Sequence, residues 1–280
     1  MVVDVHTHVG TLEHYGPSFL AASRIMRSDT KVPLATSLDE HYQAMRGVDR
    51  VVVLAFHSLY LGAHVPNDYV ADYVKRDPQK LIGFMSIDPN DPGAVPEMER
   101  AFFDLGLRGM KMSPIYQNYA PMDPRAQPIY RFAQEHHLPL LVHSATTFPR
   151  TAPLKFASPI LMEDVAIAYP DLVIILAHLG HPWAADTMAI IRKQPNVYAD
   201  LSGLHYRPWQ LYNFLMLCHE WGVMDKLLYA SDYPVATPEE TIKGLLGVNA
   251  VLGGAPLPQV PLEAVEKIIY RDPLPLLGLA

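Results

Sequence analysis

The alternation of short apolar runs with longer amphipathic segments is the feature that most constrains the fold of this chain. Eight runs are rich in β-branched or large apolar residues and are too short for helices. They cover residues 2–6, 50–56, 80–87, 108–113, 138–143, 171–178, 196–202 and 226–232. Strands that alternate with helices pair in parallel through right-handed crossovers. The pattern therefore predicts an α/β fold, a closed (β/α)8 TIM barrel.

The helical segments between these runs have readable starts. Asp123, with proline after it, predicts an N-cap and the first turn of a helix that runs to His137. Thr237 is also followed by proline, and with Glu240 it forms the pattern of a capping box. Comparable helical patterns cover residues 66–76, 93–104, 158–169, 184–194 and 208–221.

Two further segments lie outside the repeating units. Residues 10–37 form a long insert after the first strand, with little periodicity, and are expected to act as a lid or an oligomer contact. Residues 261–279 predict one extra C-terminal helix. Because chains of about 250 residues commonly form one barrel, residues 1–280 are expected to form a single domain.

Composition excludes several classes of function. No apolar run approaches the roughly 20 residues that a membrane helix needs, and the N-terminal residues carry no secretory signal, so a cytoplasmic location is expected. The net charge of −7, without a cluster of Lys and Arg, makes nucleic acid an unfavourable partner. The single cysteine, Cys218, excludes a disulfide framework and a cysteine-rich zinc site. Any metal must therefore be held by nitrogen and oxygen atoms.

Polar residues gather where the predicted strands end. In a barrel of this kind the C-terminal ends of all strands face a common mouth. His6 and His8 end the first strand, and because strand side chains alternate, both point the same way. His143, His178 and Asp232 end the fifth, sixth and eighth strands. Histidine and aspartate suit one divalent ion, with zinc favoured over manganese or iron.

Each of these residues alone has a simpler explanation. A lone histidine after a strand is usually a surface residue or a satisfied core residue, and Asp232 could cap the turn in Ser231-Asp232-Tyr233-Pro234. All of them fall at strand ends of one predicted barrel, and that coincidence favours a metal site.

Several longer motifs resemble a known family. DVHTHVG, LPLLVH, ILAHLGHPW, NVYADLSG and LLYASDYP occur in this order between residues 2 and 235. They resemble the amidohydrolase-related branch of the amidohydrolase superfamily, which includes aminocarboxymuconate semialdehyde decarboxylase, resorcylate-type decarboxylases and hydrolases of small carboxylated substrates. The resemblance implies that His6, His8, His143 and Asp232 are metal ligands. It also implies that His178 lies beside the metal and handles substrate or protons.

The segment RGMKMSP departs from the pattern of this family. It resembles a strand that often reads Lys-Leu-His-Pro, but Ser113 replaces the histidine, so this chain lacks the imidazole at that position. Lys111 could contact a substrate carboxylate, be carbamylated as in other branches, or extend from the barrel rim into solvent. His57, Tyr116 and His181 also lie on the functional face and are candidate substrate contacts.

The resemblance implies a small-molecule substrate and favours hydrolysis. A cyclic ester, amide or related carbonyl compound, itself carboxylated, would react with a metal-activated water. Asp232 would take the proton, and His178 would stabilise the oxyanion or protonate the leaving group.

The alternative is non-oxidative decarboxylation of a small aromatic or muconate-type acid, in which Asp232 or His178 protonates carbon. A decarboxylase needs a cationic anchor, for which Arg24, Arg27 and Arg46 are available. A barrel that only binds a ligand is a third possibility, and the complete set of ligands argues against it. The acidic charge disfavours a metal-dependent deoxyribonuclease, and a homo-oligomer remains possible.

Overall fold

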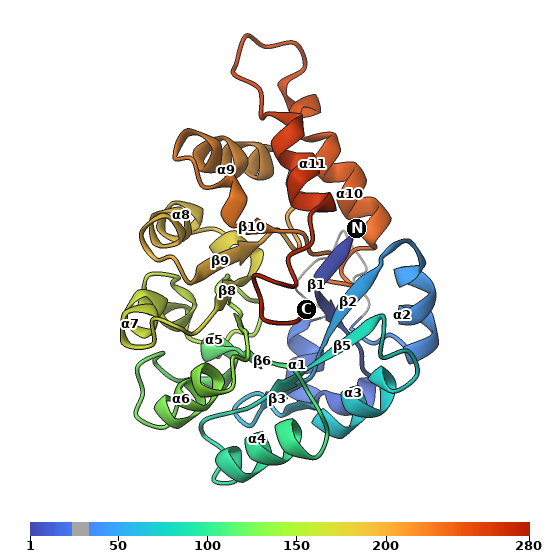
Figure 1. Ribbon diagram of the computed structural model, residues 1–280, viewed down its shortest axis with the longest axis vertical. Helices are drawn as coiled ribbons and strands as arrows, with labels where there is room; N and C mark the ends of the chain where they lie inside the picture. The colour runs from blue at the N-terminus through green and yellow to red at the C-terminus, as the bar shows by residue number, and fades with distance from the viewer. Residues whose placement is uncertain (24–33) are drawn as a thin grey trace.

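The computed structural model describes residues 1–23 and 34–280, and its centre is a sheet of eight parallel strands curled into a barrel (Figure 1). Neighbouring strands follow chain order, so each βα unit adds one strand beside the last. The strands are Val3–His8 (β1), Arg50–Leu54 (β2), Leu81–Ser86 (β5), Gly109–Met112 (β6), Leu140–Val142 (β7), Ile174–Leu176 (β8), Val197–Asp200 (β9) and Leu227–Leu228 (β10).

The barrel closes between its first strand and the segment after its last strand. Val5 N donates to Tyr229 O over 3.3 Å, and His8 N donates to Tyr233 O over 2.7 Å. The predicted (β/α)8 barrel is therefore confirmed, with a short last strand and an irregular seam.

Helices cover the outside of the sheet, as the alternating pattern predicts (Figure 1). The barrel helices are Leu38–Ala44 (α2), Asn67–Val74 (α3), Ala94–Phe103 (α4), Gln127–Glu135 (α6), Leu161–Ala168 (α7), Ala184–Lys193 (α8), Pro208–Glu220 (α9) and Pro238–Leu246 (α10). The extra C-terminal helix is Leu262–Tyr270 (α11), and Pro114–Gln117 (α5) forms one short turn after β6.

The two predicted helix starts had different outcomes. The capping box at Thr237 is confirmed, because Glu240 N donates to the Thr237 hydroxyl over 3.2 Å and Thr237 N donates to the Glu240 carboxylate over 2.9 Å. The N-cap at Asp123 is wrong, since α6 begins at Gln127. The Asp123 carboxylate instead accepts from Arg125 N over 2.9 Å and binds the Arg125 guanidinium, which stabilises a turn ahead of the helix.

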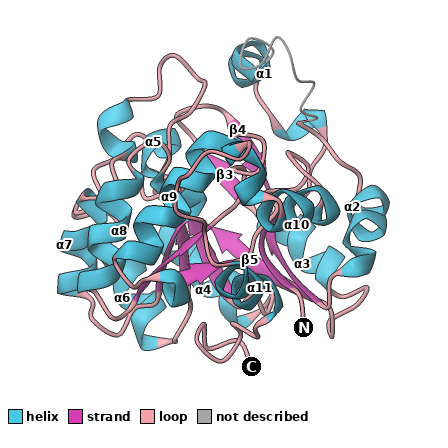
Figure 2. Cartoon of the chain, turned by 90° about the horizontal axis from the view of Figure 1, so that it is seen from above, coloured by secondary structure: helices cyan, strands magenta, loops and turns pink. Residues whose placement is uncertain are grey.

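Elements that the sequence pattern did not predict cover the C-terminal mouth of the barrel. Phe56–Ser58 (β3) and Ala63–Val65 (β4) form an antiparallel hairpin directly after β2. The insert after β1 contains a 3₁₀ turn, Leu12–His14 (η1), and a short helix, Pro17–Ser23 (α1); its residues 24–33 lie outside the described residues. Figure 2 shows α1, β3 and β4 at one end of the molecule and both chain termini at the other.

The C-terminal segment closes the opposite end of the barrel. Figure 1 shows the last residues crossing the barrel centre. There Leu274, Leu277 and Leu279 pack in one buried cluster with the inward-facing side chains of the strands, among them Val5 and Phe84. A larger apolar cluster fills the space between the sheet and the helices.

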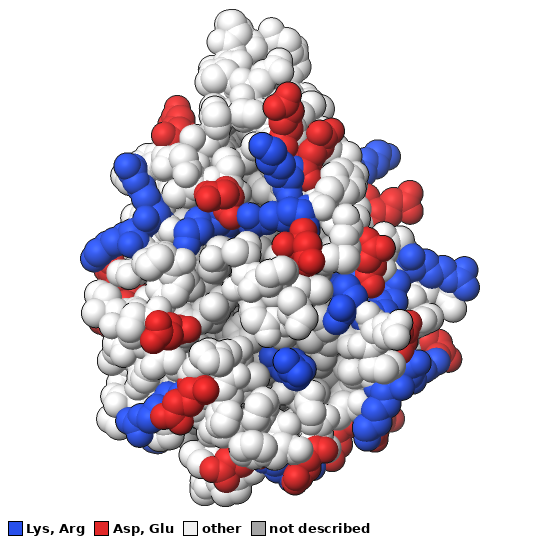
Figure 3. Space-filling view, in the orientation of Figure 1, with Lys and Arg blue, Asp and Glu red and all other residues white. Residues whose placement is uncertain are grey.

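The surface and the helices show two simple properties. On the face seen in Figure 3, Lys and Arg side chains are interspersed with Asp and Glu, and no large patch of one sign is present. Among the described residues, no helix is both long and apolar enough to cross a membrane.

The C-terminal closure predicts a difference between two adjacent leucines. Leu277 is 1% exposed and lies in the barrel cluster, whereas Leu276 is 42% exposed. We expect Leu277→Ala to lower the free energy of unfolding by about 2–5 kcal/mol, because it leaves a cavity in the barrel. Leu276→Ala, the control, should change it by less than about 0.5 kcal/mol. Urea denaturation followed by circular dichroism measures both, and equal losses would contradict the proposed closure.

Candidate metal centre

A cavity of about 740 Å³ opens at the C-terminal mouth of the barrel. The barrel strands deliver polar side chains to its floor, and the added segments supply its walls. Its floor includes His8, Lys111, His143, His178 and Asp232. This is the mouth at which active sites of such barrels form.

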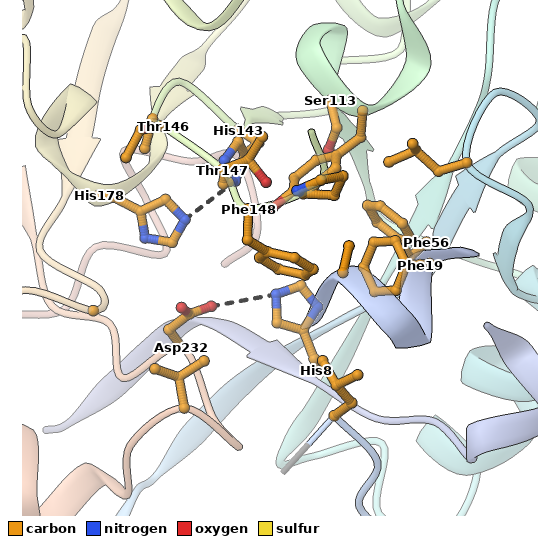
Figure 4. A pocket seen from close by; sticks show the side chains of 18 of the residues that line it. His8, Phe19, Phe56, Ser113, His143, Thr146, Thr147, Phe148, His178 and Asp232 are labelled. Carbon is orange, nitrogen blue, oxygen red and sulfur yellow. Dashed lines mark hydrogen bonds and ion pairs between the residues drawn. The ribbon is translucent and has the colours of Figure 1, made fainter. Parts of the chain in front are cut away.

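Strand β1 and the segment after β10 bring three potential ligands together. His6 Nε2 lies 3.1 Å from His8 Nε2, as expected for side chains two residues apart on one strand. Asp232 Oδ1 lies 3.5 Å from His6 Nε2. It lies 3.4 Å from His8 Nε2 (Figure 4). His6, Asp232 and His178 each offer a ligand atom within 4.8 Å of the other two.

The buried carboxylate of Asp200, at the end of β9, orients this group. His6 Nδ1 donates to Asp200 Oδ2 over 2.9 Å, so the proton of His6 sits on Nδ1 and its Nε2 lone pair faces the cluster. Burial lowers the pKa of His6 to about 3, which keeps the ring neutral at physiological pH. Burial alone would raise the pKa of Asp200, but His6 and Ser202 more than offset this and hold it below its usual range.

A chain of hydrogen bonds continues from Asp200 to His143. The Ser202 hydroxyl donates to Asp200 Oδ1, which leaves its oxygen to accept from His178 Nδ1–H over 2.7 Å. His178 Nε2 then accepts from His143 Nδ1–H over 3.3 Å (Figure 4). In this arrangement His143 Nε2 keeps its lone pair, and that atom is buried without a hydrogen-bond partner. A buried, unpartnered imidazole nitrogen is a suitable metal donor.

Strands β8 and β10 are shorter than predicted, and the backbone of the turns that follow them is strained. Strand β8 ends at Leu176 and β10 at Leu228, so His178 and Asp232 follow their strands. His178 has φ 58° and Asp232 has φ 62°, a left-handed conformation that costs a non-glycine residue about 1–3 kcal/mol. His178 N donates to Asp200 Oδ1 over 2.9 Å, and Asp232 N donates to His6 O over 2.9 Å, which stabilises both turns.

Two other buried charged groups adjoin the cluster. Lys111 Nζ lies 3.2 Å from His6 Nε2 and can donate to it, and burial lowers the pKa of this lysine to about 8. Asp4 Oδ1 accepts from His6 N over 3.2 Å and from Ser231 N over 3.0 Å. Asp4 therefore ties the first strand to the turn that carries Asp232, and burial raises its pKa to about 7.

Sequence reasoning assigned no role to Asp4, Asp200 or Ser202. The signal was present, because DVHTHVG and NVYADLSG each place an aspartate within an otherwise apolar strand. A carboxylate in such a position needs several donors to be buried stably. Sequence spacing alone does not identify those donors.

The candidate substrate contacts lie in different surroundings. Tyr116 and His181 line the cavity, as does Ser113, whose buried hydroxyl has no hydrogen-bond partner. His57 is not among the lining residues. Its Nε2 lies 3.3 Å from Asp91 Oδ2, and its ring packs against His64. A role in substrate binding stays a prediction for all of these residues.

Among the described residues, the arginines that line the cavity do not include Arg46, one of the three that the sequence suggested. Arg46 lies in the 3₁₀ turn Met45–Gly47 ahead of β2, at the opposite end of the barrel, and Arg24 and Arg27 lie outside the described residues. Arg150 and Arg207 line the cavity instead. Arg207 is held in place, because its Nη1 donates to Gly203 O over 2.9 Å and its guanidinium lies over the Tyr206 ring at 4.3 Å.

Comparison with protein families gives one match along the whole barrel. The sequence model of a family described as amidohydrolase matches residues 3–279. A comparison with curated proteins finds no match.

Several solved structures share the fold over nearly their whole length. An uncharacterised TIM-barrel protein from Bordetella bronchiseptica is 20% identical, with a TM-score of 0.72 and coverage of 99% of this chain and 98% of that one. A probable 2-pyrone-4,6-dicarboxylic acid hydrolase from Acinetobacter baumannii, with citric acid bound, is 15% identical, with a TM-score of 0.68 and 99% coverage of both chains. A 5-carboxyvanillate decarboxylase from Novosphingobium aromaticivorans, complexed with manganese and 4-hydroxy-3-methoxy-5-nitrobenzoic acid, is 17% identical, with a TM-score of 0.68 and coverage of 100% and 96%.

The role of Asp200 leads to a prediction about metal affinity. Asp200→Asn keeps the size of the side chain but removes the charge that fixes the His6 proton on Nδ1. Loss of a hydrogen-bond partner that orients a metal ligand typically weakens metal affinity about 10–100-fold. Competition titration of the protein with a chelator, using Mn²⁺ or Zn²⁺, measures this change. Asp104→Asn, on the exposed surface, is the control, and equal affinity in both variants would contradict the role given to Asp200.

Proposed function

The chain belongs to the amidohydrolase family, and we propose that it is a metal-dependent enzyme in which His6, His8, His143 and Asp232 hold one divalent ion. The donor set supports this proposal. Two imidazole nitrogens and a carboxylate oxygen lie within 3.5 Å of one another, and His143 Nε2 is buried without a partner. Nitrogen and oxygen donors of this kind suit zinc, manganese or iron. The sequence favours zinc, whereas the manganese bound in the similar decarboxylase structure favours manganese.

His178 is the residue whose role has two alternatives. A ring nitrogen of His178 lies within 4.8 Å of the ligand atoms of His6 and Asp232, which would allow His178 to be a ligand. The hydrogen-bond order favours another role, because Nδ1–H is fixed by Ser202 and Nε2 accepts from His143. We therefore assign His178 to proton transfer and His143 to the ion.

Hydrolysis is the reaction that we propose first. The ion would polarise the carbonyl group and increase the acidity of water in the site. Asp232, buried and held below its usual pKa because His178 and His8 outweigh the effect of burial, remains ionised and can accept the proton of the attacking water. His178 Nε2, which carries no proton in this hydrogen-bond order, can then receive that proton from Asp232 and pass it to the leaving group. A carboxylate on the substrate would bind Arg207 or Arg150, so a carboxylated cyclic ester or amide suits the cavity.

Decarboxylation is the second candidate, and the same arginines favour it. Arg207 and Lys111 place positive charge in the cavity beside the proposed metal ligands, where they could orient a departing carboxylate. Asp232 or His178 would take up a proton from water and deliver it to the ring carbon in place of the departing carboxylate. A panel of small lactones, amides and aromatic carboxylates, assayed with added Zn²⁺ or Mn²⁺, distinguishes the reactions. Hydrolysis releases acid without gas, whereas decarboxylation releases carbon dioxide.

Two substitutions test the proton-transfer roles with any substrate found in that panel. His178→Asn and Asp232→Asn should each lower kcat about 10²–10⁴-fold, because each removes an acid–base group. His178→Asn should retain its metal, while Asp232→Asn should lose part of its affinity. Elemental analysis and steady-state kinetics measure both effects. If His178→Asn loses the metal but keeps its rate per bound ion, His178 is a ligand. Wild-type turnover in Asp232→Asn would favour a turn-capping role.

The cation that binds the substrate gives a further prediction. Arg207→Gln should raise KM about 10–100-fold for a carboxylated substrate, since a charge-assisted hydrogen bond is lost. Its effect on kcat should be smaller. Arg46→Gln, at the opposite end of the barrel, should leave both constants within about twofold. An unchanged KM in Arg207→Gln would exclude this residue as the anchor.

A further inference from the structure

We propose that the cavity contains a second subsite, formed by Tyr15, Phe19, Phe56, Tyr116 and Phe148, which binds an apolar ring or hydrocarbon group of the substrate. We call it the aromatic subsite. The inference rests on the proposed function only in placing the reacting group at the metal ligands. It adds that the substrate extends from that group into an uncharged pocket.

The five rings form one continuous wall although they come from four separate segments. Tyr15 and Phe19 stack with ring centroids 5.2 Å apart and an interplanar angle of 14°. Phe19 meets Phe148 edge to face at 5.2 Å, and Phe56 meets Tyr116 edge to face at 5.6 Å. All five line the cavity. Packed rings in this geometry form a rigid surface that favours apolar or aromatic ligands.

The aromatic subsite is continuous with the proposed metal centre. The Tyr116 ring lies 4.8 Å from the His143 ring, so the wall begins directly beside a proposed ligand. In Figure 4 the rings of Phe19, Phe56 and Phe148 lie beside His8, and His178 and Asp232 lie across the cavity from Phe19 and Phe56. A single molecule can therefore contact both regions.

Charge is segregated within the cavity. The ionisable groups of the floor lie at the strand ends, whereas apolar side chains such as Leu34 and Leu61 adjoin the wall. Arg150, two residues after Phe148, is the charged cavity residue nearest to the wall in sequence. A substrate that was charged at both ends would leave one charge without a partner, at a cost in binding free energy. The arrangement favours a substrate with an acidic or carbonyl end and an apolar end.

The size of the cavity supports the same conclusion. Sites for drug-sized ligands measure roughly 300–1,000 Å³, and this cavity, at about 740 Å³, lies within that range. A monocyclic acid bound at the metal ligands would leave much of the aromatic wall in contact with water. A second ring or an alkyl chain would cover it and bury apolar surface on both partners.

Binding of two probe acids tests this subsite without any need for turnover. Benzoate carries one ring, and biphenyl-4-carboxylate adds a second ring without a second charge. We expect the wild-type protein to bind biphenyl-4-carboxylate at least about tenfold more tightly than benzoate in isothermal titration calorimetry. Phe148→Ala should reduce this preference to less than about threefold, and benzoate affinity should change by less than about threefold. Ala22→Trp, which fills space at the cavity wall, should have the same effect by obstruction.

Controls separate this inference from loss of folding and from the proposed function. Phe103→Ala removes a ring that is 65% exposed on α4, outside the cavity, and should keep the full preference. Circular dichroism and metal content are measured for every variant. No preference in the wild-type protein, or a preference unchanged in both Phe148→Ala and Ala22→Trp, would overturn the aromatic subsite. A preference that persists in protein unable to bind metal would support the subsite independently of the proposed metal-dependent function.

Discussion

The carboxylate of Asp200 is the group on which the arrangement of the site depends. It accepts from His6 Nδ1, from the Ser202 hydroxyl and from the His178 backbone, so three different segments are fixed by one buried charge. Without these donors the desolvation of a fully buried carboxylate would be prohibitive. These contacts also fix the proton positions of the donors. His6 and Ser202 donate to Asp200, so His6 Nε2 and the Ser202 oxygen are left as acceptors. The cavity-facing nitrogens are therefore prepared as acceptors or ligands before anything binds.

The barrel brings together the side chains that this carboxylate then holds in place. Parallel strands in chain order bring residues that are far apart in sequence, such as His6 and Asp232, to within hydrogen-bonding range at one mouth. Strained backbone occurs in the turns after two of the strands, where His178 and Asp232 adopt left-handed conformations. Apolar closure at the other end, through the C-terminal segment, provides stability at a distance from the chemistry. Such a separation allows strained turns to persist, because the surrounding structure determines them.

The sequence predicts the features that follow from the periodicity of its apolar residues and from the order of its strands and helices. Alternation within β1 indicates that His6 and His8 share a face, and the order of eight βα units indicates that strand ends meet. It does not predict which donors surround Asp200, because those contacts join residues from different units. The helix start at Asp123 was wrong because a local side-chain contact to Arg125 competes with capping. The hairpin after β2 was missed because its two strands of three residues are too short to show a period.

The proposed metal donors and the aromatic subsite come from different parts of the chain. The residues proposed to carry out the reaction are therefore not those proposed to select the substrate. His6, His143 and Asp232 belong to the strand ends, which every barrel of this type must have. Phe19 lies on α1 in the insert, and Phe56 begins the hairpin after β2. Hydrolysis and decarboxylation make the same demand on the donors, a fixed cation and a residue that transfers a proton. The two reactions differ in which group of the substrate lies next to these donors. Contacts made by the rest of the substrate position that group. If the proposed function holds, the aromatic wall and Arg207 would influence the choice of reaction more than the metal ligands do, because they would determine which bond of the substrate lies next to the ion.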